Sequence, residues 1–122
     1  GALKIDINNH ESIFKGMPSE IKVLQWHSYE VTNLPSNTNL LASSNACLVQ
    51  AFSFNKAFGL QFHVEQTAKT VPEWSCVPEY QTALEETLGK NALAKFENDI
   101  NSNLSNFNKN AEQVYKNFLQ VF

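Results

Sequence analysis

Apolar and polar residues alternate along the first half of the chain, which is the spacing of a half-buried β-strand. Residues 3–7 and 21–31 follow this alternation over the longest stretches. Three shorter apolar segments come next, separated by turn-forming residues: 40–42, 47–54 and 59–63. A short turn or helix between the first two strands is expected to hold Ile13 and Phe14. This half of the sequence therefore predicts a sheet.

After Thr67 the pattern changes to one that is typical of helices. Pro78 suits the first turn of a helix over residues 79–88, and Gly89 suits the position just past its end. The apolar residues that follow are spaced by three and four, as one face of a helix requires. They are Leu93, Phe96, Ile100, Leu104, Phe107, Ala111, Val114, Phe118 and Phe122. We therefore expect a long amphipathic helical segment that reaches the end of the chain.

Asparagines are frequent within this segment, at positions 101, 103, 106, 108 and 110. Asparagine is a poor helix former, because its side chain competes for backbone hydrogen bonds. The composition therefore predicts a weak point in the helix, or a break between two helices, near residues 101–105.

Composition places the chain among single globular units of mixed α and β structure. A chain of 122 residues with 43% hydrophobic content can build one modest core. Its net charge of −3 and its nine lysines without any arginine argue against a nucleic-acid partner. The sequence has no apolar run of about 18 residues and no basic-then-apolar leader, so we expect no membrane association and a cytoplasmic location.

Two cysteines, Cys47 and Cys76, stand far apart and form no metal-binding spacing. Cys47 leads directly into an apolar strand, where a small buried thiol is ordinary. We therefore expect reduced thiols and neither a disulfide nor a metal site.

The segment over residues 59–65 carries the clearest candidate chemistry. It delivers His63 and Glu65 two positions apart, on the same face of a strand end. An imidazole can accept a proton from a thiol near neutral pH, and a carboxylate can hold its tautomer. Taken alone, an H-x-E pair at a strand end is more often an exposed histidine beside a solvated carboxylate than a catalytic pair. A metal site would need further ligands at recognisable spacing, and none is present.

Five short motifs around this pair occur in a fixed order. They are QWHSYEV at 25–31, LP at 34–35, LASS at 41–44, QAF at 50–52 and QFHVE at 61–65. In this order they resemble the class I glutamine amidotransferase family, and in particular its stand-alone, GMP-synthase-like members. The resemblance implies a three-layer α/β sandwich with a flavodoxin-like mixed sheet. Residues 1–122 would form only the C-terminal half of that domain, with a sheet-rich part at 1–67 and closing helices at 68–122.

The resemblance also implies roles for individual residues. Members of the family hydrolyse glutamine to glutamate and ammonia with a Cys-His-Glu triad, in which His63 would be the base and Glu65 its orienter. Backbone groups of Ser28 and Tyr29 would bind the glutamine. The sequence departs from the family at Val64, where proline is frequent, and at Tyr29 and Glu30, where an aspartate is common in GMP-synthase-like members.

The cysteine nucleophile of the family lies in a G-x-C-x-G elbow, and this chain contains no such motif. We therefore expect the nucleophile to lie outside this chain, and we expect the chain alone to be inactive. No cofactor or metal is implied. The expected partners are glutamine and either the missing N-terminal half or a second copy of the chain, because half of an α/β sheet leaves edges uncovered.

Two other functions stay open at this point. Residues 100, 104, 107, 111, 114, 118 and 121 step in a heptad-like spacing, which favours a noncatalytic interaction module or pseudoenzyme. Packing of this stripe on the chain's own sheet explains the spacing better. The family fold also occurs in gamma-glutamyl peptide hydrolases, and the motifs do not separate that reaction from ammonia transfer.

Overall fold

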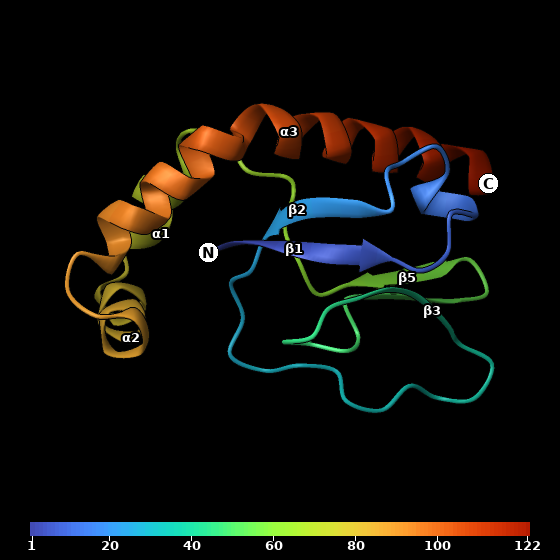
Figure 1. The fold of residues 1–122 in the computed structure, drawn as a ribbon, viewed down its shortest axis with the longest axis horizontal. Coiled ribbons are helices and arrows are strands. Elements are labelled where there is room, and N and C mark those ends of the chain that lie inside the picture. Colours follow the sequence, from blue (N-terminus) through green and yellow to red (C-terminus); the bar gives the residue numbers. More distant parts are fainter.

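The computed structural model describes residues 1–122 as one five-stranded sheet with helices packed against it (Figure 1). The strands are β1 (Ala2–Ile7), β2 (Glu20–Leu24), β3 (Asn39–Ser43), β4 (Ala51–Phe54) and β5 (Ala57–Leu60). Their order in the sheet is β2-β1-β3-β4-β5, and every pairing is antiparallel. A 3₁₀ turn, η1 (Ser12–Phe14), lies between β1 and β2 and buries Ile13 and Phe14 as expected.

The hairpin between β4 and β5 shows why these residues form a tight turn. Asn55 adopts a left-handed conformation with φ of 54°, which asparagine tolerates better than most residues. Gly59 pairs with Phe52 across the hairpin, and a Cβ at position 59 would lie 2.5 Å from the Phe52 ring. A side chain at position 59 would therefore require the Phe52 ring to move.

The sheet curls, and a single bridge joins its two ends. After β5 the chain crosses to the open edge of β2, where Leu24 and His63 form an isolated antiparallel bridge. The Leu24 N–H donates to the His63 carbonyl over 3.0 Å, and the His63 N–H donates to the Leu24 carbonyl over 2.9 Å. Sheet closure thus places His63 beside the last residue of β2.

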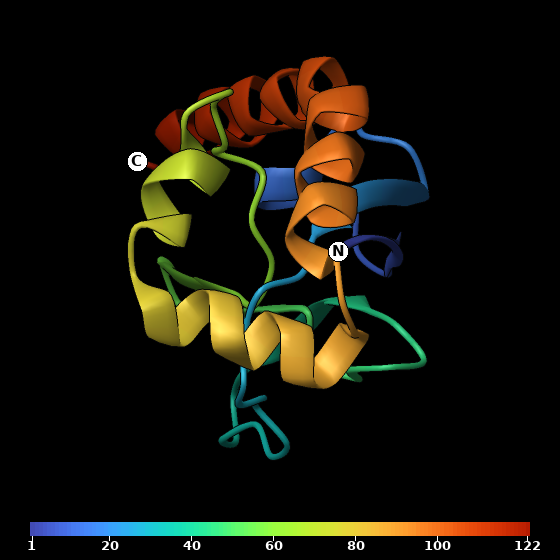
Figure 2. The ribbon, with the colours of Figure 1, turned by 90° about the vertical axis from the view of Figure 1, so that its left-hand side faces the viewer.

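Three helices follow the sheet: α1 (Thr70–Ser75), α2 (Pro78–Leu88) and α3 (Ala92–Val121). α3 runs along the length of the sheet, whereas α1 and α2 gather at one end of the molecule (Figures 1 and 2). Pro78 begins α2 and Gly89 follows it with φ of 92°, so the sequence-based limits of this helix are confirmed.

The break that asparagine content predicts near residues 101–105 is wrong, because α3 is one continuous helix of 30 residues. Ile100 and Phe107, on either side of that segment, are fully buried against the rest of the chain. The Asn103 side chain donates back to the Asp99 carbonyl over 2.7 Å, within the helix. Tertiary packing of the apolar face therefore outweighs the low helix propensity of asparagine.

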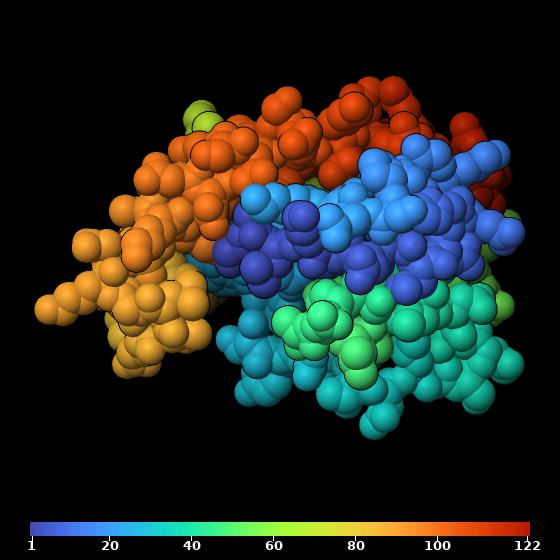
Figure 3. All heavy atoms as spheres, viewed as in Figure 1, coloured from blue at the N-terminus to red at the C-terminus, as the bar shows by residue number.

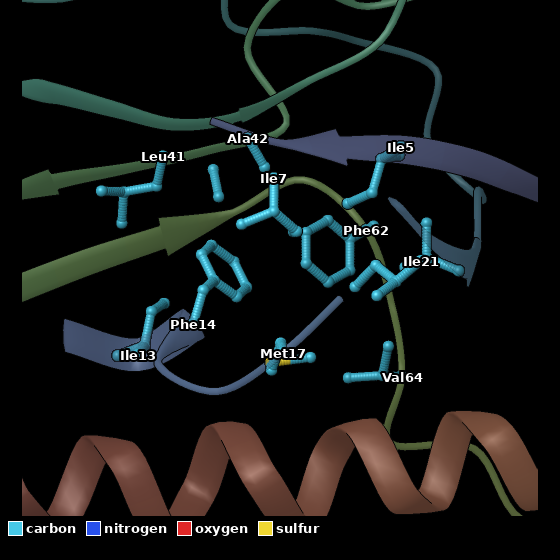
Figure 4. Close-up of a cluster of buried hydrophobic side chains, with 12 residues drawn as sticks. Ile5, Ile7, Ile13, Phe14, Met17, Ile21, Leu41, Ala42, Phe62 and Val64 are labelled. Atoms are coloured by element: carbon cyan, nitrogen blue, oxygen red, sulfur yellow. The ribbon is translucent and has the colours of Figure 1, made fainter. Parts of the chain in front are cut away.

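Two apolar clusters fill the space between the sheet and the helices. The larger cluster lies between η1, the sheet and α3 (Figure 4). Its members include Ile5, Ile7, Phe14, Ile21, Phe62 and Val64. The smaller cluster joins the end of β2 to α1 and α3, and consists of Leu24, Val71, Phe96, Ile100 and Phe107. The heptad-spaced stripe of α3 thus packs largely on its own chain.

Three strands are shorter than the alternation predicts. β2 ends at Leu24, so residues 25–31 form an irregular loop, and residues 47–50 and 61–63 lie outside β4 and β5. Backbone pairing extends slightly past the strand ends, because Gln25 pairs with Gly1 and the Gln61 N–H donates to the Gln50 carbonyl. Glutamine and histidine side chains in these segments add hydrogen bonds to one another and to Val31. None of the helices is long and apolar enough to cross a membrane.

Candidate active site

His63 and Glu65 form the closest polar pair in the candidate site. The His63 Nδ1 and Glu65 Oε1 atoms lie 2.6 Å apart, within the range of a charge-assisted hydrogen bond. The other carboxylate oxygen, Glu65 Oε2, accepts a hydrogen bond of 2.9 Å from the Val64 N–H. Both oxygens are therefore engaged, and the carboxylate is fixed against the Nδ1 edge of the ring.

The surroundings of the pair favour an ionised carboxylate. Desolvation is the largest single influence and raises the pKa of Glu65. The hydrogen bonds from the His63 ring and from backbone N–H groups, together with the attraction of His63, outweigh desolvation, so the pKa of Glu65 lies below its ordinary value. The side chain of His63 is 32% exposed, whereas that of Glu65 is 67% exposed. The imidazole is thus the less accessible member of the pair.

The His63 ring packs against an aromatic side chain of α1. The Trp74 ring on α1 meets the His63 ring edge-on, with centroids 5.7 Å apart. Trp74 in turn packs on Trp26, at 5.1 Å, and Trp26 packs on Phe96 of α3, at 4.8 Å. These contacts limit rotation of the imidazole about its side-chain bonds.

The loop over residues 25–31 begins directly after Leu24, the residue that pairs with His63. It carries Ser28 and Tyr29, and the Tyr29 side chain points away from the protein, with 89% of it exposed. The Tyr29 carbonyl oxygen lies 2.7 Å from His27 Nδ1 and accepts a hydrogen bond of 3.3 Å from Gln61 Nε2. The Gln61 side-chain oxygen accepts from the Val31 N–H over 3.2 Å. Gln61 therefore ties the loop to the segment that carries His63.

A second set of polar side chains supports the start of this loop. Gln25 Nε2 donates to Gln50 Oε1 over 2.9 Å, and Gln50 Nε2 donates to the Ser44 hydroxyl over 3.0 Å. Gln25 Oε1 lies 2.7 Å from His27 Nε2. Gln50 is only 1% exposed, and both the oxygen and the nitrogen of its amide are hydrogen-bonded, as a buried amide requires.

Sequence patterns alone assign no role to Gln25, His27, Gln50 or Gln61. A signal for them existed, because Gln50 and Gln61 interrupt otherwise apolar segments. A buried amide needs hydrogen-bond partners, so a glutamine inside an apolar strand indicates a polar contact with another part of the chain.

The candidate residues do not share one hollow. A cavity of about 660 Å³ lies beside the 25–31 loop, where it meets β1 and the segment at 44–47; it is lined by His27, Ser28, Tyr29, Glu30, Ser44 and Cys47, among others. Figure 3 shows this region as the dark blue of β1 beside the green of the residues that follow β3. A smaller hollow of about 320 Å³ lies between Ser28 and α2. His63 lines neither of them.

Cys47 is buried, as the sequence predicted, and its surroundings oppose ionisation. Burial is the main cause that raises the pKa of the Cys47 thiol, and the Glu30 carboxyl raises it further. The thiol donates to the Val49 carbonyl over 3.4 Å and makes no hydrogen bond to a histidine. No group of three His, Cys, Asp or Glu side chains is arranged to hold a metal ion.

The fold is shared with solved glutamine amidotransferases. A glutamine amidotransferase from Thermotoga maritima aligns with 97% of this chain and 49% of its own, with a TM-score of 0.82 and 23% identity. The enzyme from Methylobacillus flagellatus aligns with all of this chain and 52% of its own, with a TM-score of 0.71 and 20% identity. These likenesses establish the α/β fold of this class.

Residues 2–73 match the family model described as glutamine amidotransferase class-I, and the chain belongs to this family. It is 43% identical to a glutamine-hydrolyzing GMP synthase subunit from Thermoplasma acidophilum over 68 residues, which are 53% of this chain and 34% of that protein. It is 40% identical to the protein of the same name from Saccharolobus solfataricus over 67 residues, or 53% and 36% of the two chains. The match thus spans about a third of these relatives.

Proposed function

We propose that this chain supplies the base and its orienting carboxylate to a glutamine-hydrolysing site whose cysteine lies on the complementary half of the domain. The observation that carries the proposal is the His63–Glu65 contact of 2.6 Å at Nδ1. This contact leaves His63 Nε2 without a hydrogen bond inside the chain, so Nε2 can face a thiol. Family membership supports the choice of glutamine as substrate.

The reaction follows from this arrangement by ordinary acyl-transfer chemistry. His63 Nε2 takes the thiol proton as the cysteine sulfur attacks the side-chain amide carbon of glutamine. The protonated ring then gives the proton to the leaving nitrogen, so that ammonia departs and a glutamyl thioester remains. A water molecule, deprotonated by the same nitrogen, cleaves the thioester to glutamate and restores the thiol. Glu65 keeps Nδ1 protonated and stabilises the imidazolium in both steps.

We further propose that backbone groups of Ser28 and Tyr29 bind the glutamine. Their N–H groups make no hydrogen bond within the chain, so they are available to a ligand. Hydrogen bonds to a substrate position it for attack and contribute through orientation. The relatives named as glutamine-hydrolyzing GMP synthase subunits suggest that the ammonia passes to a second polypeptide, a synthetase.

The test is to supply the complementary half of the domain, by fusion or co-expression, and to measure ammonia release from glutamine. His63→Ala is expected to lower the turnover number at least about a hundredfold, since a general base contributes roughly that much. His10→Ala, at an exposed histidine outside the site, is the matched control. The 122-residue chain alone is expected to release no ammonia.

Unchanged turnover in His63→Ala would refute the role of His63. If the complemented protein releases no ammonia at all, the noncatalytic alternative is favoured. Release of glutamate from a gamma-glutamyl peptide in preference to glutamine would instead indicate a peptide hydrolase of the same fold.

A further inference from the structure

Both ring nitrogens of His27 face oxygen atoms. Nδ1 lies 2.7 Å from the Tyr29 carbonyl, and Nε2 lies 2.7 Å from Gln25 Oε1. A backbone carbonyl can only accept a hydrogen bond, so Nδ1 must carry a proton for the first contact to form. This requirement does not depend on how the Gln25 amide is oriented.

The hydrogen-bonded side-chain amides of Gln25 and Gln50 allow a proton on Nδ1 of His27 whether the ring is neutral or carries a proton on both nitrogens. As the amides stand, Gln25 Nε2 donates to Gln50, so Gln25 Oε1 faces His27 and Nε2 must donate as well. If the Gln25 and Gln50 amides are both reversed, Gln25 donates to an unprotonated Nε2, and the Ser44 hydroxyl donates to Gln50. In both arrangements the Nδ1–H still points at Tyr29.

The Tyr29 carbonyl is thereby held by two donors, His27 Nδ1 and Gln61 Nε2. A trans peptide is planar and sets its carbonyl and N–H on opposite sides, so fixing the carbonyl also fixes the N–H of Glu30. That N–H makes no hydrogen bond inside the chain. It belongs to the same turn as the free N–H groups of Ser28 and Tyr29, on the wall of the 660 Å³ cavity.

We propose that His27 is a positioning residue of the glutamine-binding turn: its Nδ1–H, aligned by the Gln25–Gln50–Ser44 chain, locks the Tyr29–Glu30 peptide so that the Glu30 N–H is presented to the substrate. This inference rests on the proposed function, because it assigns glutamine to the turn. It adds the Glu30 N–H as a binding group and gives His27 a function separate from proton transfer.

A first experiment tests the locking contact without any activity. Long-range ¹H–¹⁵N spectra of the 122-residue chain report which ring nitrogen of His27 carries a proton. We expect a protonated Nδ1, either alone or together with Nε2. A neutral ring with its only proton on Nε2, the tautomer that free imidazoles favour, would overturn the proposal.

A second experiment replaces His27 by asparagine or by glutamine, whose side-chain amides can each take the place of one ring nitrogen. The amide nitrogen of His27→Asn lies near the position of Nδ1 and can replace the bond to Tyr29, whereas that of His27→Gln lies near Nε2 and cannot. In the complemented protein we expect His27→Gln to raise the KM for glutamine roughly five- to tenfold, the effect of one lost hydrogen bond, with kcat within about twofold. His27→Asn should stay within about twofold of the wild-type KM.

Equal KM values for the two variants, or a loss confined to kcat, would contradict the proposal. His27 is exposed, so neither substitution should prevent folding, which circular dichroism checks. If the complemented protein shows no glutaminase activity, the proposed function fails. The ring spectra, together with the amide shifts of Tyr29 and Glu30 in the two variants, still decide whether His27 locks the turn.

Discussion

Leu24 and His63 exchange two backbone hydrogen bonds, of 3.0 and 2.9 Å, although they belong to segments far apart in the chain. This bridge fixes the candidate base to the last residue of β2, and the loop that carries Ser28 and Tyr29 starts at the next position. The candidate base and the turn proposed to bind glutamine are therefore joined at the same backbone bridge. Displacement of either segment would change the distance between them.

Trp74→Ala tests whether the aromatic group positions His63. Removing the ring should lower the free energy of unfolding by about 2 kcal/mol, since Trp74 is half-buried. It should also lower kcat of the complemented protein several-fold, because the imidazole gains rotational freedom. Tyr80→Ala is the control, since Tyr80 contacts Trp26 but not His63. It should cost stability and leave kcat unchanged; equal kcat losses in both variants would show that the effect is general destabilisation.

Protonation of Glu65 in acid should make the folded chain slightly less stable. Its folded pKa is lowered, so its contribution is present above the unfolded pKa of about 4.3 and is lost as the pH falls through the folded value. Because the side chain is 67% exposed, the contribution should not exceed about 1 kcal/mol. Urea unfolding should show Glu65→Gln less stable than wild type at pH 7, and the gap should narrow as the pH falls below the unfolded pKa. Glu86→Gln serves as an exposed control, and a gap that does not narrow at any acid pH would contradict a charge effect.

Asn117 should be one of the few asparagines of α3 whose side chain stabilises the folded protein. Its buried amide donates to the Ile13 carbonyl over 2.8 Å and to the Lys15 carbonyl over 2.9 Å, which ties the helix to η1. Asn117→Ala should lower the free energy of unfolding by about 2–3 kcal/mol, because two carbonyls lose their donor. Asn108→Ala, on the exposed face, should be neutral or stabilising by a few tenths of a kcal/mol. Similar effects at both positions would mean that the η1 contact contributes nothing.

Gln66 is 2% exposed, and neither its side-chain oxygen nor its nitrogen has a hydrogen-bond partner. Replacing a buried amide without partners by an apolar group of similar shape removes a desolvation cost. Gln66→Met should therefore raise the midpoint of thermal unfolding, with a gain of about 1 kcal/mol in the free energy of unfolding. A loss of similar size would show that the amide has a polar partner in the folded protein.

The two thiols should differ sharply in reactivity. Cys76 is exposed, whereas Cys47 is buried and its pKa is raised by burial and by Glu30. Iodoacetamide should alkylate Cys76 in the folded chain and reach Cys47 only after unfolding in urea, as peptide mass spectrometry can measure. Rapid alkylation of Cys47 in the folded state would contradict its assignment to the core.

Local signals predicted the elements that depend on local chemistry. Pro78 and Gly89 mark the ends of α2 because each acts through its own backbone geometry. The continuity of α3 depends on contacts of Ile100 and Phe107 with distant residues, which asparagine content does not report. Side-chain hydrogen bonds made by Gln25 and Gln61 hold the loop that follows Leu24, and no alternation of apolar residues anticipates such bonds.

The same distinction between local and long-range contacts applies to the candidate site. The spacing of His63 and Glu65 placed them on one face, and the 2.6 Å contact follows from that spacing. The contacts of His27 and Gln50 join segments that only the folded chain brings together, so motif order could mark these residues but not give them a role.

The continuity of α3 has a consequence for how the protein unfolds. The helix contributes Phe96, Ile100 and Phe107 to one apolar cluster and packs Ala111 and Val114 against the other. Neither cluster can therefore lose its packing without disrupting the same helix. Loss of α3 should therefore be a single cooperative event. α2, which buries no residue completely, can fray before it. Amide hydrogen exchange should then report two levels of protection, with α2 exchanging early and the two halves of α3 exchanging together.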